Sequence, residues 1–246
     1  MKFHLKTGLF LAAATLTLLF ACEKDPKPFV AGGYVYTFFD AVSPAAETFT
    51  FLAEQGGYFT TAQKSSLFVL PNAFVKANNG QPVTGEIDLG LYEVKTKGDM
   101  IRFNLPTMTT DLRVLESGGM VYFAAEQNGQ PLRLKPGYSF EINQWTENPV
   151  QDMRLFFETF PPSLSDTFNA WALFPDSIEN NVILTSSPDT INLPGFGFFY
   201  AIDTMYTWIN CDRFLDVPAS QLTNASAKLS DVFTTENTAV YLVFNE

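Results

Sequence analysis

Alternation of apolar and polar residues, with segments rich in β-branched and aromatic side chains, dominates the chain from residue 33 onward and predicts β-strands. Gly, Pro, Asn and Asp punctuate these segments, and no stretch of three turns with helical periodicity separates them. In the first half the predicted strands are Gly33–Phe39, Tyr58–Thr61, Ser66–Leu70, Gly85–Val94, Met100–Leu105, Gly119–Ala125, Pro131–Lys135 and Ser139–Ile142. In Gly85–Val94 the apolar phase shifts at Tyr92 and Val94, which predicts a β-bulge there.

A second series of strands follows a polar stretch at residues 143–153, which we interpret as a linker. The strands predicted after it are Arg154–Phe160, Phe168–Phe174, Asn181–Thr185, Gly197–Ile202, Tyr206–Asn210 and Thr238–Phe244. We therefore expect an all-β protein with two antiparallel β-sandwich-like domains, at residues 32–142 and 154–246. The last apolar run, Ala239 to Phe244, is expected to dock as a strand; the alternative is that the chain lacks residues carried by similar proteins, which would leave the second domain incomplete.

Two similar tetrapeptides, Asn79-Gly80-Gln81-Pro82 and Asn128-Gly129-Gln130-Pro131, predict hairpin turns. Asn-Gly accepts the positive φ angles of tight turns, and Pro can begin the returning strand without donating an N–H. A duplicated binding loop is the alternative interpretation.

The N-terminal 21 residues have the pattern of a cleaved signal peptide. Lys2 and Lys6 precede the apolar run Gly8–Phe20, which is shorter than the ~20 residues that a membrane-spanning helix needs. The run ends in Leu19-Phe20-Ala21-Cys22, which resembles the lipobox of bacterial lipoproteins. That resemblance implies cleavage before Cys22 and acylation of this cysteine; an ordinary cleavage site beside a cysteine is the alternative.

Residues 22–31 are expected to form an extended tether, because Pro26 and Pro28 favour an extended spacer. Glu23-Lys24-Asp25 resembles the export signal that directs lipoproteins of Bacteroidota-type bacteria to the outer face of the outer membrane. A plain solvated tether is the alternative.

The first domain also carries a family resemblance. Ser66 to Phe74, followed by Asn79 to Gly85 and an alternating strand, resembles the core of the ZU-type β-sandwich shared by zonula occludens proteins, netrin receptors and ankyrins. Leu115 to Met120 and Leu132-Arg133-Leu134 resemble its form in Bacteroidota lipoproteins. The likeness covers residues 32–142 and implies a structural or interaction role. The His-Phe-Ser motif at which some relatives cleave themselves does not occur, so self-cleavage is not expected.

The composition and the net charge of the chain limit the classes of partner that it can bind. Hydrophobic residues make up 46% of the 246 residues, and 25 are Phe, which excludes a disordered chain. The formal net charge is −11, and removing Lys2 and Lys6 with the signal takes it to −13. A nucleic-acid binder needs the opposite sign. Membrane attachment must therefore come from the lipid and not from a basic patch.

The number and positions of the histidine and cysteine residues exclude several kinds of catalytic site, metal site and disulfide. The single histidine is His4, in the predicted signal peptide, so the mature chain has no Ser-His or Cys-His catalytic pair and no His-ligated metal site. Cys211 has no disulfide partner once Cys22 is acylated; we expect it to be buried and inert, with a reactive thiol as the alternative. No catalytic residues, metal or cofactor are predicted. Hydrolysis by a pair of carboxylates is not excluded, but the sequence does not identify the pair.

The strongest candidate ligand site is Trp208, Asn210 and Asp212, which alternation places on one face of a strand. A Trp beside an amide and a carboxylate could stack on a sugar ring and bind its hydroxyls; a structural corner is the alternative. Three triplets resemble the Asp-Ser/Thr-apolar acceptors of Bacteroidota O-glycosylation, with Ser177, Thr190 and Thr204 as the acceptors; ordinary turn chemistry also explains them.

Two functional hypotheses follow. The first is a non-enzymatic, lipid-anchored protein of the outer membrane, on its outer or its inner face, that contacts proteins or other envelope components through its sandwich domains. The second is an accessory lipoprotein that binds or helps to process glycans.

Overall fold

The computed structural model describes residues 39, 41–159, 170–174, 182–185, 197–215, 226–234 and 237–243, and structural statements here refer to these residues. Their strands are β1 (Glu47–Leu52), β2 (Gly57–Thr60), β3 (Ser66–Val69), β4 (Phe74–Lys76), β5 (Glu86–Val94), β6 (Leu115–Gln127), β7 (Gln130–Leu134), β8 (Phe140–Trp145), β9 (Arg154–Thr159), β10 (Ala170–Leu173), β11 (Ile183–Thr185), β12 (Gly197–Ile202) and β13 (Trp208–Phe214). A short helix, α3, spans Lys97–Arg102.

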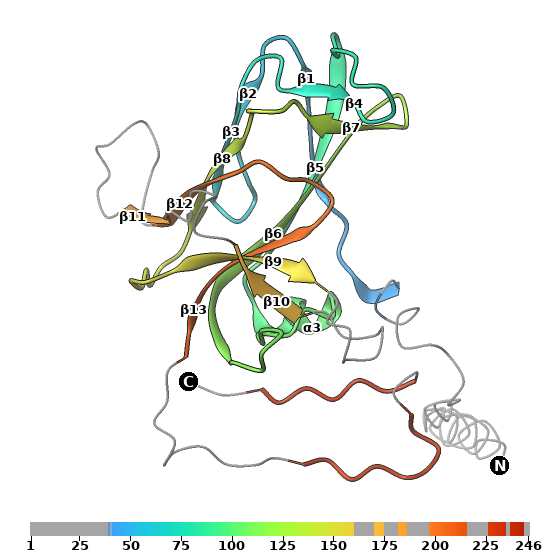
Figure 1. Ribbon diagram of the computed structural model, residues 1–246, viewed down its shortest axis with the longest axis vertical. Helices are drawn as coiled ribbons and strands as arrows, with labels where there is room; N and C mark the ends of the chain where they lie inside the picture. The colour runs from blue at the N-terminus through green and yellow to red at the C-terminus, as the bar shows by residue number, and fades with distance from the viewer. Residues whose placement is uncertain are drawn as a thin grey trace, which may run out of the picture.

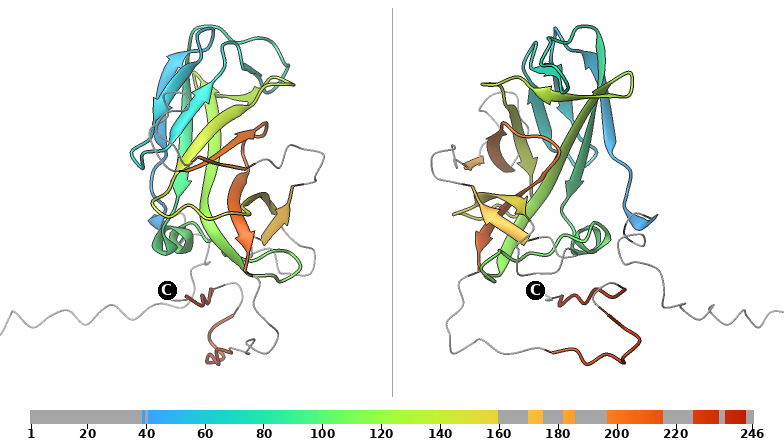
Figure 2. Two further views of the ribbon diagram at one scale, coloured as in Figure 1. Left: turned by 90° about the vertical axis from the view of Figure 1, so that its left-hand side faces the viewer. Right: turned by 45° about the vertical axis from the view of Figure 1, so that its right-hand side comes forward.

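Two antiparallel sheets form the body of the protein. The first has the order β1-β5-β6-β13-β9-β10, with β7 paired to β6 and β4 paired to β7; the second has the order β11-β12-β8-β3-β2. The predicted all-β fold with antiparallel sheets is therefore confirmed. Strands β5 and β6 run the length of the body, with β1, β2, β4 and β7 at one end and α3 at the other (Figure 1). Two further views show the same elements from the sides (Figure 2).

The main core lies between the two sheets. Alternate residues of β5, such as Ile87, Leu89 and Leu91, are buried in one cluster with residues of the second sheet such as Leu67 and Ile142. The two sheets meet directly where Phe123 of β6 stacks on Phe140 of β8, with ring centroids 4.6 Å apart. Each buried ring contributes a few kcal/mol of hydrophobic free energy, which agrees with the high phenylalanine content.

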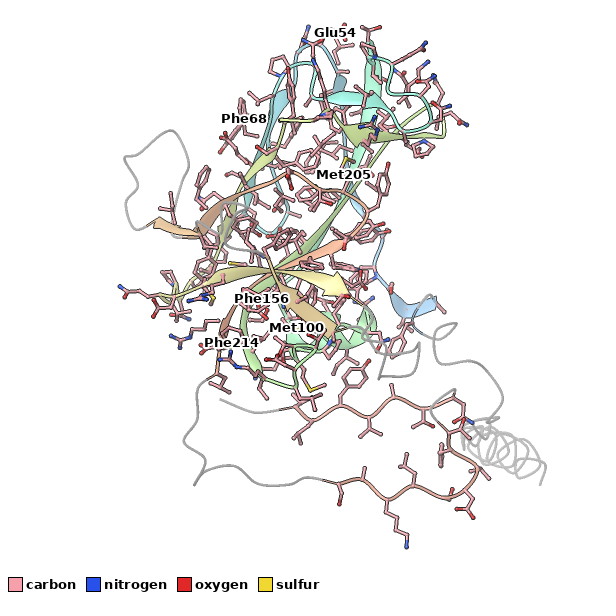
Figure 3. All side chains as sticks on the ribbon, in the orientation of Figure 1. Glu54, Phe68, Met100, Phe156, Met205 and Phe214 are labelled. Atoms are coloured by element: carbon pink, nitrogen blue, oxygen red, sulfur yellow. The ribbon has the colours of Figure 1, made fainter. Side chains whose placement is uncertain are left out.

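A second, smaller core covers the opposite face of the first sheet. Val94, Met120 and Phe156 lie there beneath Met100 of α3 and Leu105. Met100, Phe156 and Phe214 of this region are labelled at the α3 end of the molecule (Figure 3). The first sheet is therefore apolar on both faces at this end.

The division into two separate sandwich domains, 32–142 and 154–246, is wrong. Strand β13 pairs with β6, and β12 pairs with β8, so both sheets combine strands from both halves of the chain. The physical reason is burial: Phe198 and Ile209, from the second half, complete the core begun by the first. The linker prediction for residues 143–153 fails at its start, because Asn143, Gln144 and Trp145 belong to β8 and pair with β12.

Local predictions failed where a residue is buried on an unexpected face. The predicted strand Met100–Leu105 begins instead as α3, whose N-terminus is capped by Thr96 Oγ1 accepting from the Asp99 N–H at 3.1 Å. The predicted bulge at Tyr92 and Val94 is absent from the described ladder of β5, which pairs with β6 without a shift. The apolar phase changes because Leu91 faces the main core whereas Val94 faces the second one.

The two predicted turns are confirmed as turns. Asn128 and Gly129 both have positive φ and join β6 to β7, and Gly80 has a φ of +72° in the turn after β4. By contrast, the predicted strand Thr238–Phe244 is not confirmed, because residues 238–243 form no strand. The predicted strand Gly33–Phe39 lies outside the described residues except for Phe39, and Cys22 with its tether lies wholly outside them.

Candidate functional site

The three residues predicted to share a ligand site end in different environments. Trp208 is half-buried at the start of β13, whereas Asn210 and Asp212 are both 0% exposed. The ladder between β13 and β6 shifts register between Asn210 and Asp212, which is a β-bulge. The prediction that Asn210 and Asp212 bind a ligand is therefore wrong, because neither side chain reaches solvent.

Asp212 instead supports the bulge. Its Oδ2 accepts a hydrogen bond of 2.5 Å from Asn210 Nδ2, and Ser117 Oγ donates to Asn210 Oδ1 at 3.2 Å. Burial raises the pKa of the Asp212 carboxyl well above its ordinary value, although hydrogen bonds from Ser117, Asn210 and the Gly118 N–H act in the opposite direction. This is the structural corner that the sequence left open as the alternative.

The backbone of β6 passes close to the second sheet beside this corner. A Cβ placed on Gly119, whose φ is +125°, would lie 2.3 Å from Gln144 Nε2. Only glycine fits both the positive φ and the close approach. Gln144 is fully buried, and its Oε1 accepts a hydrogen bond of 2.8 Å from Tyr200 Oη.

Cys211 is a core residue, as predicted. Its side chain is 0% exposed in the main core. Burial raises the pKa of the thiol well above its ordinary value, and the nearby Asp212 acts in the same direction. The thiolate is therefore disfavoured, and with it the alternative of a reactive thiol.

Trp208 belongs to an aromatic cluster that sequence reasoning missed. Tyr92 of β5, Tyr122 of β6 and Trp208 of β13 are register partners on adjacent strands. The Trp208 ring centroid lies 5.4 Å from that of Tyr122, 6.1 Å from that of Tyr92 and 5.1 Å from that of Phe103. We call these four residues the aromatic cluster. All are half-buried, at the border of the second core.

An acidic side chain adjoins the aromatic cluster. Glu158 of β9 is half-buried, and its Oε2 lies 3.5 Å from the backbone N of Trp208. Burial raises the pKa of Glu158, and the Trp208 N–H opposes this effect. Burial likewise raises the pKa of Tyr122, with smaller contributions from the charges of Tyr206, Glu158 and Tyr92. These groups are therefore close enough to sense one another electrostatically.

Tyr206 extends the aromatic surface and is held rigidly. It is 42% exposed, and its Oη lies 2.7 Å from the carbonyl oxygens of both Ala125 and Leu132. An exposed ring fixed in this way loses little conformational freedom when it meets a ligand. The pattern of Tyr and Trp across β5, β6 and β13 was visible in the sequence, but only the register reveals that the rings meet.

A second polar cluster joins Ser65, Glu93 and Lys95. Lys95 Nζ lies 3.0 Å from Ser65 Oγ and forms an ion pair of 2.8 Å with Glu93. A serine beside a lysine is the arrangement of some hydrolases. Here, however, Ser65 is 0% exposed. Its hydroxyl donates to Glu93 and accepts from Lys95 and from the Trp145 N–H, so its hydrogen-bonding capacity is filled.

This polar cluster is therefore interpreted as structural. Burial lowers the pKa of Lys95, while the charge of Glu93 raises it. Together with a hydrogen bond of 2.9 Å from Thr61 to Glu93, these contacts fasten the turn between β2 and β3 to the end of β5.

The predicted O-glycosylation sites are only partly described. Thr204 is half-buried between β12 and β13, beside the exposed Asp203. Ser177 and Thr190 lie outside the described residues.

Other features of the described residues are few. They contain no group of three or more His, Cys, Asp or Glu side chains placed to hold a metal ion. Over the same ranges, no helix is both long and apolar enough to span a membrane. A hollow of about 280 Å³ is lined by Val150, Gln151, Asp152, Met153, Val182 and Phe198, and none of the predicted site residues borders it.

Comparisons with known proteins found no match. No protein-family model, no curated protein and no solved structure matches the chain.

Proposed function

We propose that the protein is a non-enzymatic binding protein of the bacterial outer membrane. In this proposal, acylated Cys22 anchors the chain to the membrane, and the β-sheet body faces outward and contacts another component of the envelope. The membrane is thus one partner, through the lipid, and an envelope protein or glycan is the other. The resemblance of the segments Ser66 to Phe74 and Asn79 to Gly85 to the core of the ZU-type β-sandwich supports an interaction role over a chemical one.

The observation that carries the binding role is the aromatic cluster with Tyr206 beside it. Tyr and Trp side chains are enriched at binding surfaces because they combine a large apolar area with a polar edge. In this protein they come from three adjacent strands of a rigid sheet, which holds them in place before any partner arrives. We propose this face of the first sheet as the binding surface.

The anchor is tested by Cys22→Ser. We expect the variant to appear in the soluble fraction and to lose labelling by a palmitate analogue, because several acyl chains, at about 0.8 kcal/mol per buried CH₂, are needed for stable attachment. Cys211→Ser is the matched control, and its labelling should be unchanged. Membrane fractionation of Cys22→Ser identical to that of the parent protein would contradict the anchor, and protease treatment of intact cells tests exposure at the surface.

The binding surface is tested by photo-crosslinking in cells. A photoreactive phenylalanine analogue at Tyr206 should give a discrete crosslinked species, because this ring is exposed beside the aromatic cluster. The same analogue at Tyr58, which is 47% exposed on the other sheet, is the control. Equal crosslinking from both positions, or none from Tyr206, would contradict the proposed surface.

A further inference from the structure

Four polar groups are presented together at the aromatic cluster. Tyr92, Tyr122 and Trp208 are all half-buried, and each carries a polar edge: a hydroxyl on each tyrosine and an indole N–H on the tryptophan. The carboxylate of Glu158, on the neighbouring strand β9, lies 3.5 Å from the backbone N of Trp208. The surface therefore combines apolar ring area with three hydrogen-bond donors and one strong acceptor.

This combination disfavours an apolar partner. Burying a hydroxyl or an indole N–H without a hydrogen bond costs free energy, so a purely apolar peptide would leave these donors unsatisfied. A ligand for this surface should present apolar C–H groups to the rings and hydroxyl groups to their edges.

The charges around the aromatic cluster disfavour an anionic ligand. Within the described part of the chain, the contacts of lysine and arginine with aromatic rings involve Trp145, Phe214 and Tyr138, and none involves the aromatic cluster. Glu158 would repel a carboxylate or a phosphate. An uncharged ligand avoids this repulsion and can donate to the Glu158 carboxylate.

The spacing of the rings also disfavours an organic cation held between them. A cation cage needs open space enclosed by several ring faces. Here Tyr92 and Phe103 are 5.4 Å apart and meet edge to face at 75°, and Tyr92 and Tyr122 are 5.9 Å apart at 68°. Rings at these separations and angles are packed against one another. The aromatic cluster thus offers an outer surface and no internal cage.

From these contacts we propose that the aromatic cluster, with Glu158 and Tyr206, binds a neutral sugar residue of a polysaccharide. The C–H face of the sugar packs on the rings of Trp208 and Tyr122. Its hydroxyls donate to Glu158 and accept from the two tyrosines and the indole. This inference rests on the proposed binding role and names its ligand class.

The test is affinity electrophoresis of the full-length protein in detergent, with soluble dextran, galactomannan, xyloglucan or laminarin in the gel. We expect at least one of these neutral polysaccharides to retard the protein, and we expect polygalacturonate, which is acidic, not to do so. Tyr92→Phe combined with Tyr122→Phe keeps both rings and removes two donors. Each lost hydrogen bond should weaken binding by roughly two- to tenfold.

Two further variants separate binding from packing. Glu158→Gln removes the charged acceptor and should weaken retardation by a similar factor, while Tyr58→Phe removes an exposed hydroxyl on the other sheet and should have no effect. Trp208→Ala should abolish retardation; its thermal unfolding is measured in parallel because Trp208 also packs against the second core. The conservative variants keep the proposal testable even if Trp208→Ala does not fold.

Three results would overturn the proposal. They are no retardation by any of the four neutral polysaccharides, retardation that the tyrosine and Glu158 variants leave unchanged, and quenching of tryptophan fluorescence by tetramethylammonium without retardation. If polysaccharides fail while the analogue at Tyr206 still forms its crosslink, the sugar assignment fails and the binding role stands. If both fail, the proposed binding surface is wrong.

Discussion

Asp212 is a carboxyl group fully removed from water at the centre of a β-bulge. Its Oδ2 accepts from Asn210, while its Oδ1 has no partner among the described residues. Burial disfavours the carboxylate more strongly than the hydrogen bonds from Ser117, Asn210 and the Gly118 N–H favour it, so the environment favours the neutral acid.

Asp212→Asn should flatten the dependence of stability on pH. The folded-state pKa of Asp212 is raised above the unfolded value of ~3.9, so the folded protein holds the proton more tightly. The contribution of Asp212 to stability is therefore full below pH ~3.9 and is lost as the pH rises toward the folded-state pKa. Asparagine stays neutral throughout, so the stability of the variant relative to the parent should increase from pH 4 to pH 8.

Urea unfolding at a series of pH values measures this effect, and Asp203→Asn, at an exposed acid between β12 and β13, is the control. The prediction fails if the stability difference between Asp212→Asn and the parent protein does not change over this range. A uniform loss of stability would show that the bulge needs the carboxyl for its geometry alone.

At the residue scale, the burial of Cys211 could be predicted from the sequence, and the ligand site only in part. The lone thiol in a strand pattern indicated a buried side chain, and the structure confirms it. Alternation placed Trp208, Asn210 and Asp212 on one face, but alternation does not reveal whether that face is covered. Asn210 and Asp212 are fully buried, whereas Trp208 is half-buried at the border of the second core.

At the scale of elements, residues 238–243 have a strand pattern but form no strand. Tyr241 contacts the body through its hydroxyl, which donates to Asn104 Oδ1, and through an edge-to-face ring contact with Phe39 at 6.3 Å. Val240 and Leu242 are 52% and 64% exposed. Large apolar side chains are seldom so exposed at successive alternate positions of a paired strand.

Amide hydrogen exchange distinguishes this segment from a paired strand. Residues 238–243 lie in no ladder, so their amides should exchange within seconds at neutral pH, whereas those of Ile209 and Asn210 in β13 should be protected by ladders on both sides. Protection of residues 238–243 comparable to that of β13 would restore the strand that the sequence predicted.

The strands that sequence analysis placed well are those with one consistent buried face. Ser66–Leu70 and Gly197–Ile202 correspond closely to β3 and β12, because alternate residues of each strand lie in the main core: Leu67 and Val69 in β3, and Phe198, Tyr200 and Ile202 in β12. Met100–Leu105 was misassigned because Met100 belongs to α3 and Leu105 follows it, and both side chains are buried in the second core, on the other side of the first sheet. Sequence periodicity reports burial, and it cannot tell which neighbour provides it.

At the scale of the whole molecule, the two halves of the chain form one body. β13 lies between β6 and β9 in the first sheet, and β12 lies between β8 and β11 in the second. The linker-like composition of residues 143–153 suggested a boundary, but composition does not specify strand pairing. The pairing is decided by which arrangement buries Phe198, Tyr200 and Ile209.

A fragment of residues 32–153 should therefore not fold by itself. Without β12 and β13 it would expose the edges of β6 and β8 and lose part of the main core. We expect no cooperative thermal transition by circular dichroism and strong binding of an apolar dye, with the full-length chain as the control. A cooperative transition of the fragment near that of the full chain would show that the first half is an independent domain after all.

The interleaving of the two halves also has a consequence for the order of events during synthesis. Ser117 and Asn210, which touch in the finished protein, are separated by 93 positions along the chain. The second sheet cannot be completed before Ile202 of β12 has been made, nor the first before Phe214 of β13, and long-range pairing of this kind is slow. We expect a nascent polypeptide with this topology to remain unfolded for most of its synthesis. An unfolded chain can pass through a narrow translocation pore. The topology therefore suits the export route that we propose, since the body can close only after nearly all of the chain has reached the far side.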